Sequence, residues 1–195
     1  MTDTPERATE PTALVDQLTQ LLDVERIDTD LYRGARQPGG VGRVFGGQVI
    51  AQALQAAQRS VEDGRTAHSL HAYFMRPGDE NHPIIYRVVR DFDGRSFANR
   101  RIIAMQGSQP ILNMTASFQS PAEGLHHQSE MPDVPGPDQL VSERELHEAI
   151  RDEVPDKFRP FFMRARPIEM RPVNPLNWYK PGPRSEEHTS ELQSH

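Results

Sequence analysis

The sequence of 195 residues contains no cysteine. A disulfide framework and a thiolate nucleophile are therefore both excluded. No apolar run approaches the roughly 20 residues that span a bilayer. The acidic start, MTDTPERATE, is not typical of a signal peptide. These absences predict a cytoplasmic protein without a membrane partner.

Acidic residues outnumber basic ones, 28 to 22. The net charge is −6, and no basic run interrupts the sequence, which argues against nucleic acid as a partner. An anionic ligand would need a local basic site. The 35% of hydrophobic residues is low but sufficient for a core, and 17 prolines with 13 glycines indicate many turns. The length suits one domain of about 100 to 150 residues with an additional segment.

One stretch has no formal charge at all, residues 44–58, although about one residue in four is charged in an average chain. Its spacing predicts a buried helix from Gly46 to Ser60, entered through a glycine turn. Its alanines would let a sheet approach closely, so we expect strands curled around it. Four apolar residues share one helical face, and three glutamines form a single polar stripe: Ile50, Leu54, Ala57 and Val61; Gln48, Gln52 and Gln55.

The pattern after this helix changes to the period of two that is typical of strands. Turn signals separate four such segments, which are 68–76, 84–92, 96–106 and 111–119. A helix followed by a four-stranded antiparallel meander predicts an α+β fold. Upstream we expect a disordered leader over 1–12, a short amphipathic helix and an edge strand within 23–36. The predicted core consists of Phe45, Ile50, Leu54, Leu70, Phe74, Leu112, Met114 and Phe118.

Four stretches then point to a family: RVFGGQVIAQAL, HSLHAYFMRPGD, PIIYRVVRDFDGRSFANRR and MTASFQ. In order and spacing they resemble the N-terminal hotdog domain of the acyl-CoA thioesterase II family, from about residue 14 to about residue 175. The resemblance implies a hotdog fold over 13–120, in which an antiparallel sheet wraps around a central helix. It also implies two hotdog domains that associate and hydrolyse acyl-CoA to free fatty acid and CoA, without a cofactor or metal.

The rest of the chain is interpreted from the same resemblance. Residues 121–165 resemble the linker between the two domains and include an amphipathic run that predicts a helix. Residues 166–183 resemble the start of a second, truncated hotdog domain, with RPIEMRP as its first strand. The last segment, 184–195, resembles the conceptual translation of a sequencing-library adapter. We therefore expect it to be an unstructured artefact.

The family's catalytic apparatus is an Asp, a Ser or Thr and a Gln that together orient a water, and it lies in the second domain. No catalytic residue is therefore assigned here. By internal resemblance, Gln119 takes the place of the catalytic Gln, whereas the strand at Ser69 takes the place of the Asp without a carboxylate. N–H groups at the helix start could bind a thioester oxyanion or a phosphate, and arginines could bind phosphates. The expected substrate-binding residues are Gly46, Gly47, Gln48, Arg76 and Gln119.

Simpler interpretations remain open for these residues. The two glycines could serve only the tight helix entry, and Gln119 could be an ordinary amide at a strand end. Arginines of the strands could be a solvated face. His68 and His71, three apart on a strand, point to opposite faces, so no metal site is expected.

Two classes of function also remain open. The first is a thioester hydrolase, and the second is a non-catalytic acyl-CoA-binding or assembly module. A hydratase or dehydratase would need a His and a carboxylate near the central helix, and 44–58 has neither.

Overall fold

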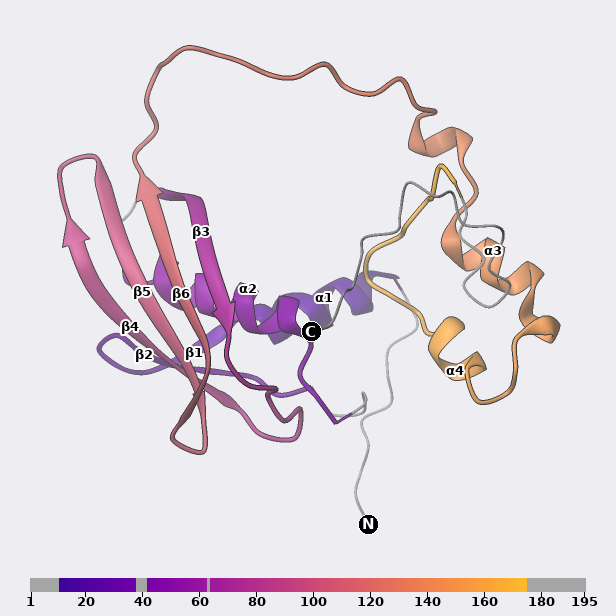
Figure 1. Cartoon of the computed structure of the whole chain (residues 1–195), viewed down its shortest axis with the longest axis horizontal. Coiled ribbons are helices and arrows are strands. Elements are labelled where there is room, and N and C mark those ends of the chain that lie inside the picture. The colour runs from indigo at the N-terminus through magenta and orange to yellow at the C-terminus, as the bar shows by residue number, and fades with distance from the viewer. Residues whose placement is uncertain (1–10, 38–41, 63, 175–195) are drawn as a thin grey trace, which may run out of the picture. The chain divides into compact units, whose positions relative to one another are not determined.

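The computed structural model describes residues 11–37, 42–62 and 64–174. The chain divides into two compact units, Val15–His127 and a second one that contains Gln128 onward. The sheet belongs to the first of these units (Figure 1). Within the described residues, no helix combines the length and the apolar character needed to cross a membrane.

The first unit is built around one long helix. Helix α1 (Pro11–Leu22) leads into the unit, and α2 (Gly46–Gln58) lies against one face of a sheet (Figure 1). Both helices were expected. Helix α2 begins at the predicted residue and ends two residues earlier than predicted, with Arg59 as its C-cap.

Six antiparallel strands form one sheet in the order β1-β2-β4-β5-β6-β3. The predicted α+β class is confirmed, but the meander is wrong in one respect: β3 pairs with β6 and forms an edge of the sheet. Alternation of side chains shows which face a residue occupies, not which strand is its neighbour. The bounds are β1 (Val24–Asp28), β2 (Leu31–Gly34), β3 (Thr66–Phe74), β4 (Ile84–Asp93), β5 (Phe97–Gln106) and β6 (Gln109–Gln119).

The core lies between α2 and the facing side of the central strands. Three predicted core residues of β6, Leu112, Met114 and Phe118, are almost fully buried. They pack with apolar residues of β4 and β5. The helix contributes small side chains, so the sheet approaches it closely, as expected: Val49, Ala53, Ala56 and Ala57.

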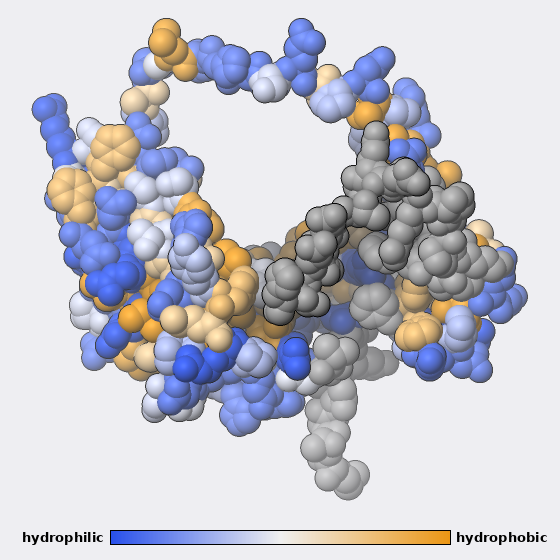
Figure 2. All heavy atoms as spheres, viewed as in Figure 1, coloured by the Kyte–Doolittle hydropathy of each residue, from blue (hydrophilic) through white to orange (hydrophobic). Residues whose placement is uncertain are grey.

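Three other residues of the predicted core are not part of it. Phe45, Leu70 and Phe74 are 78%, 42% and 56% exposed, whereas Ile50 and Leu54 are partly buried and pack against the core. Leu70 and Phe74 belong to β3, which is an edge strand with no neighbour on its outer side in the described sheet. Hydrophobic side chains therefore reach the surface of this unit, where Figure 2 shows them in orange.

The polar stripe of α2 faces inward, because Gln48 and Gln52 are buried. The Gln52 amide donates to the carbonyls of Leu21 and Ala35, at 2.5 and 3.1 Å, and the Gln48 amide donates to Ala35 at 3.1 Å. A methyl group at Gly34 would come within 2.3 Å of Gln52 Oε1. The glutamines thus fasten the end of α1 and the end of β2 to the central helix.

The second unit contains short helical segments after an irregular stretch. These are η1 (Pro137–Gln139), α3 (Glu143–Ala149), η2 (Arg151–Glu153) and α4 (Arg159–Phe162). Ser142 and Glu145 form a capping box at the start of α3. The region interpreted as a linker therefore contains helices.

The expected first strand of a second hotdog domain, residues 166–172, is not a strand. A strand needs a hydrogen-bonding neighbour. This segment instead forms hydrogen bonds with the η1–α3 region. The Met170 carbonyl accepts the Glu143 N–H at 2.7 Å, and the Arg171 side chain donates to the Leu140 carbonyl at 2.8 Å. The expected adapter-like tail lies outside the described residues, as does most of the expected leader.

Candidate functional site

A pocket of about 480 Å³ opens where α2 begins, and we call it the α2 pocket. Its apolar lining includes the buried Val49 and Ile111 and the half-exposed Phe74 and Met75. Two arginines, Arg43 and Arg76, complete its polar lining, and none of its ten lining residues is Asp, Glu, His, Ser or Thr. An apolar pocket with cationic groups and no acid suits a ligand that is both apolar and anionic.

The start of α2 adds positive potential to this pocket. The N-cap residue, Phe45, has an extended backbone and no capping side chain, and the first turn contains no acidic residue. The first N–H groups of a helix lack intrahelical acceptors, and the helix dipole favours an anion there. One part of the prediction is wrong, however: the Gln48 N–H is not free, since it donates to the Phe45 carbonyl at 3.0 Å.

Two aromatic rings explain the pair of glycines. A methyl group at Gly46 would lie 2.9 Å from Cζ of Phe74, and one at Gly47 would lie 2.5 Å from Cε1 of Phe45. Real Cβ atoms do not come this close to other heavy atoms, so a side chain at either position would displace a ring. The glycines therefore let two exposed aromatic rings lie over the first turn of the helix.

The two arginines of the pocket lack the ion pairs that several other arginines of this unit form with acidic side chains. Arg76 Nη1 donates to the Pro110 carbonyl at 2.9 Å, and neither Arg43 nor Arg76 has an ion pair with a described residue. Sequence reasoning missed Arg43. Its position three residues before the uncapped helix was the available signal, because a cation there adds to the helix dipole.

Other arginines considered as phosphate ligands are already engaged. Arg100 is 1% exposed, donates to Ser60 Oγ at 2.8 Å and pairs with Asp93 at 2.6 Å. Arg90 is bound by Asp30 through both Nε and Nη2, and the hydrogen bond with Asp30 raises the pKa of the Arg90 guanidinium. These side chains stabilise the fold rather than offering free phosphate contacts.

The structure does not bring Gln119 to the α2 pocket. Gln119 pairs with Thr66 and Phe97 at one end of the sheet, whereas Phe74, at the pocket, pairs with Leu112. The seven residues from 112 to 119 correspond to about 23 Å along a strand. Gly46 and Arg76 thus share one pocket, Gly47 lies beside it, and Gln119 is at the other end of β6.

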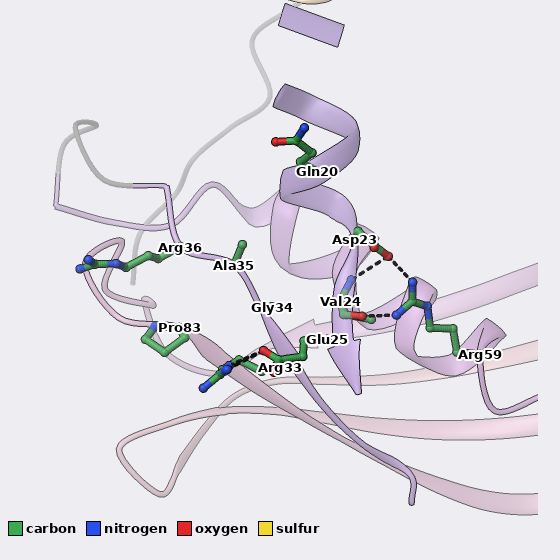
Figure 3. Close-up of a pocket in the computed structure, with 10 residues that line it drawn as sticks. All are labelled: Gln20, Asp23, Val24, Glu25, Arg33, Gly34, Ala35, Arg36, Arg59 and Pro83. Carbon is green, nitrogen blue, oxygen red and sulfur yellow. Dashed lines mark hydrogen bonds and ion pairs between the residues drawn. The ribbon is translucent and has the colours of Figure 1, made fainter. Parts of the chain in front are cut away.

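A larger pocket of about 650 Å³ lies beside β1 and β2 (Figure 3). Two of its three arginines bind acidic side chains: Arg33 binds Glu25 through Nε and Nη2, and Arg59 binds Asp23 and the Val24 carbonyl. The third, Arg36, donates to the backbone carbonyl of Asn81. The C-terminal turn of α1 also lines it, and a helix C-terminus disfavours anions. Despite its size, this pocket is less suited to an anionic ligand than the α2 pocket.

The described residues contain no group of three or more His, Cys, Asp or Glu that could hold a metal. The two histidines of β3 have other neighbours. His68 Nε2 lies 2.9 Å from Ser117 Oγ, and the His71 ring contacts the Tyr73 ring edge-on.

Comparison with known proteins agrees with this architecture. Residues 35–119 match the model of the acyl-CoA thioesterase N-terminal domain. The chain is 39% identical over 170 residues to acyl-CoA thioesterase 2 of Haemophilus influenzae, which covers 86% of this chain and 59% of that protein. It is also 39% identical over 165 residues to human acyl-coenzyme A thioesterase 8, and this match covers 81% of this chain and 52% of that protein. The chain thus spans little more than half the length of these curated relatives.

Solved structures show the same similarity. A tesB protein of Mycobacterium avium subspecies paratuberculosis matches with a TM-score of 0.60 and 36% identity, over 65% of this chain and 50% of that one. The acyl-CoA thioesterase II TesB2 of Mycobacterium marinum matches with a TM-score of 0.56 and 40% identity, over 62% and 45%. A hotdog protein of Alicyclobacillus acidocaldarius, 23% identical with a TM-score of 0.58, supports the fold. Residues 35–119 therefore match the acyl-CoA thioesterase N-terminal domain, and the unit that contains them has the hotdog fold.

Proposed function

We propose that this chain binds acyl-CoA at the α2 pocket and is the N-terminal part of an acyl-CoA thioesterase, which acts in fatty acid metabolism. The observation that carries this proposal is the composition of the pocket: apolar walls, two arginines and no acid beside an uncapped helix start. Acyl-CoA joins an apolar chain to a group with several negative phosphates. Its two chemical parts correspond to the two kinds of surface in the pocket.

Each residue has a role in this proposal. The N–H groups at Gly46 and Gly47 face the thioester oxygen or a phosphate, because the first turn of a helix offers unpaired donors. Arg43 and Arg76 bind phosphate oxygens through charge-assisted hydrogen bonds. Gln119 would meet only a different part of the ligand, or a ligand held by a partner domain.

The pocket binds but does not supply a base. None of its lining residues can take a proton from water at neutral pH, and neither register neighbour of Gln119 is a carboxylate. Loss of a positioned general base typically costs about 10²- to 10⁴-fold in rate. We therefore propose that hydrolysis depends on an Asp, a Ser or Thr and a Gln outside the sheet unit.

The same proposal includes self-association through β3. An edge strand carries unpaired N–H and C=O groups, and β3 also exposes Leu70 and Phe74. A second hotdog domain added at this edge, from the same or another chain, would cover both the strand and the apolar side chains. The greater length of the curated relatives supports this reading.

A non-catalytic acyl-CoA-binding or assembly module is the second candidate, and the lack of a base in the pocket favours it. One assay tests what both candidates predict for this chain, namely ligand binding without hydrolysis. Residues 1–195 are incubated with a medium-chain acyl-CoA and a reagent for free thiol, while binding of a non-hydrolysable octyl thioether of CoA is measured by calorimetry.

We expect binding of the thioether and thiol release near background. Absence of binding would reject the proposal. Rapid thiol release that is abolished by Gln119→Ala would instead place the catalytic centre in this unit.

A further inference from the structure

The turn between β3 and β4 consists of residues 77–83, and its first two residues, Pro77 and Gly78, line the α2 pocket. A side chain at the end of β5 binds this turn. Gln106 is the last residue of β5. Its Oε1 accepts the Asp79 N–H at 2.8 Å, and its Nε2 donates to the carbonyls of Asp79 and His82, both at 2.9 Å. One amide thus meets three main-chain groups of a single turn.

The same turn is hydrogen-bonded to the segment that enters α2. The Gly78 carbonyl accepts the N–H of Val44 at 2.9 Å, and Val44 lies two residues before the helix. A methyl group at Gly78 would lie 3.1 Å from Ile111 Cδ1 and 3.3 Å from Gln106 Oε1. The turn is therefore packed tightly between the end of the sheet and the helix entry.

We infer that Gln106 is a positioning residue of the α2 pocket: it fixes the wall at Pro77 and Gly78 and, through Val44, the entry into α2. Gln106 does not itself line the pocket, so it acts through the turn rather than through the ligand. The three hydrogen bonds to the turn require a side chain with one acceptor and two donors. Glutamine has both, whereas ionised glutamate lacks the donors and leucine lacks all three groups. The consequence for ligand binding rests on the proposed function, but the effect on the turn does not.

Amide hydrogen exchange tests the effect on the turn. Gln106→Ala is compared with Gln109→Ala, a matched control because Gln109 is an exposed glutamine in the same hairpin. We expect the Val44 N–H to exchange about tenfold faster in Gln106→Ala, since the turn loses several hydrogen bonds, and to be unchanged in the control. The amides of Ile102 and Met114, in the middle of the sheet, should exchange at the wild-type rate.

Two outcomes would overturn the inference. Unchanged exchange at Val44 would show that the turn holds its position without Gln106. An equal acceleration at Val44, Ile102 and Met114 would show a general loss of stability instead of a local one.

Gln106→Glu isolates the role of the two donors. Glutamate keeps the acceptor for the Asp79 N–H, but its ionised carboxylate faces two carbonyl oxygens. At pH 7 we expect Val44 to exchange as fast as in Gln106→Ala, with part of the protection restored below the ordinary carboxyl pKa of about 4.3, where a protonated carboxyl can donate. Wild-type protection at pH 7 in this variant would contradict the inference.

Calorimetry with the octyl thioether of CoA tests the consequence for the ligand. We expect Kd to rise about tenfold in Gln106→Ala, comparable to the loss of about one net hydrogen bond, and to stay unchanged in Gln109→Ala. If the wild type does not bind the thioether, the proposed function fails, and the exchange experiment still decides the role of Gln106. Equal Kd values in the wild type and Gln106→Ala would overturn the positioning of the pocket.

Discussion

The hydroxyl of Tyr86 donates a 2.8 Å hydrogen bond to Oε1 of Gln52 inside the core. Burial raises the pKa of Tyr86 far above its ordinary value. Because the amide nitrogen of Gln52 donates to two carbonyls, every polar atom of this side chain has a partner. A glutamine in the middle of an uncharged helix is therefore a satisfied core residue, and it connects the helix to the sheet.

Replacing Tyr86 with phenylalanine should leave Gln52 Oε1 buried without a donor. A buried unsatisfied acceptor costs about 1 to 3 kcal/mol, so we expect a loss of that size in the free energy of unfolding, measured with urea. Tyr73→Phe is the control, because Tyr73 is 67% exposed and should change stability by less than about 0.5 kcal/mol. Equal effects of the two variants would contradict the role of Gln52.

Gly46→Ala separates stability from ligand binding. The new methyl group would displace the Phe74 ring, which should narrow the α2 pocket and weaken binding of the octyl thioether of CoA. Alanine favours a helix over glycine by about 1 kcal/mol. This gain offsets the cost of displacing the ring, so the melting temperature should change little. Gly124→Ala is the control, since no atom lies near the added methyl group there. Unchanged thioether binding would show that the ring does not shape the pocket.

Asp79 should make the stability of the chain depend on acidic pH. The hydrogen bond from the Asn81 N–H, with further contributions from His82 and the Asn81 side chain, lowers the pKa of Asp79 below its ordinary 3.8. The unfolded chain therefore takes up this proton first as the pH falls. The stabilisation is complete above the unfolded-state pKa and is lost as the pH falls through the lower folded-state pKa.

We expect the difference in melting temperature between the wild type and Asp79→Asn to be constant near pH 6 and to shrink below pH about 4. A difference that grows on acidification would have the wrong sign for a lowered pKa. Urea titrations at the same pH values provide an independent measurement.

Leu70→Lys should weaken self-association without unfolding the unit. Leu70 is already exposed on the edge strand β3, so a lysine there costs the isolated unit little, whereas a charge at an edge opposes pairing with another strand. Ile27→Lys is the matched control, because Ile27 has similar exposure on β1, the opposite edge. Sedimentation velocity measures the effect. If association depended on Ile27 and not on Leu70, the interface would lie at the β1 edge instead of the β3 edge.

Local patterns predicted the elements of this fold well. The uncharged run 44–58 and the alternation around Leu112 and Met114 placed α2 and β6 correctly, because helix and strand periods are properties of neighbouring residues. The pairing of β3 with β6 depends on contacts between segments far apart in the sequence. Alternation within a single strand cannot show it.

The candidate site was only partly predictable for the same reason. Gly46 and Arg76 were expected and lie in one pocket. Arg43 was missed, because its relevance depends on the fold placing it beside β3. The inward direction of the Gln48 side chain was missed too. Its amide donates to the Ala35 carbonyl, and the sequence of the helix alone does not show that this carbonyl lies within reach.

The central claim, that the α2 pocket binds the anionic and apolar parts of acyl-CoA, is tested most directly by removing its two arginines together. Calorimetry with the octyl thioether of CoA compares Arg43→Gln/Arg76→Gln with Arg87→Gln/Arg144→Gln, which removes the same charge from exposed positions outside the pocket. Each hydrogen bond to a charged group contributes about 1.5 to 3 kcal/mol. We predict that the pocket variant binds at least about tenfold more weakly while the control binds like the wild type. Equal Kd values for the two double variants would contradict the account.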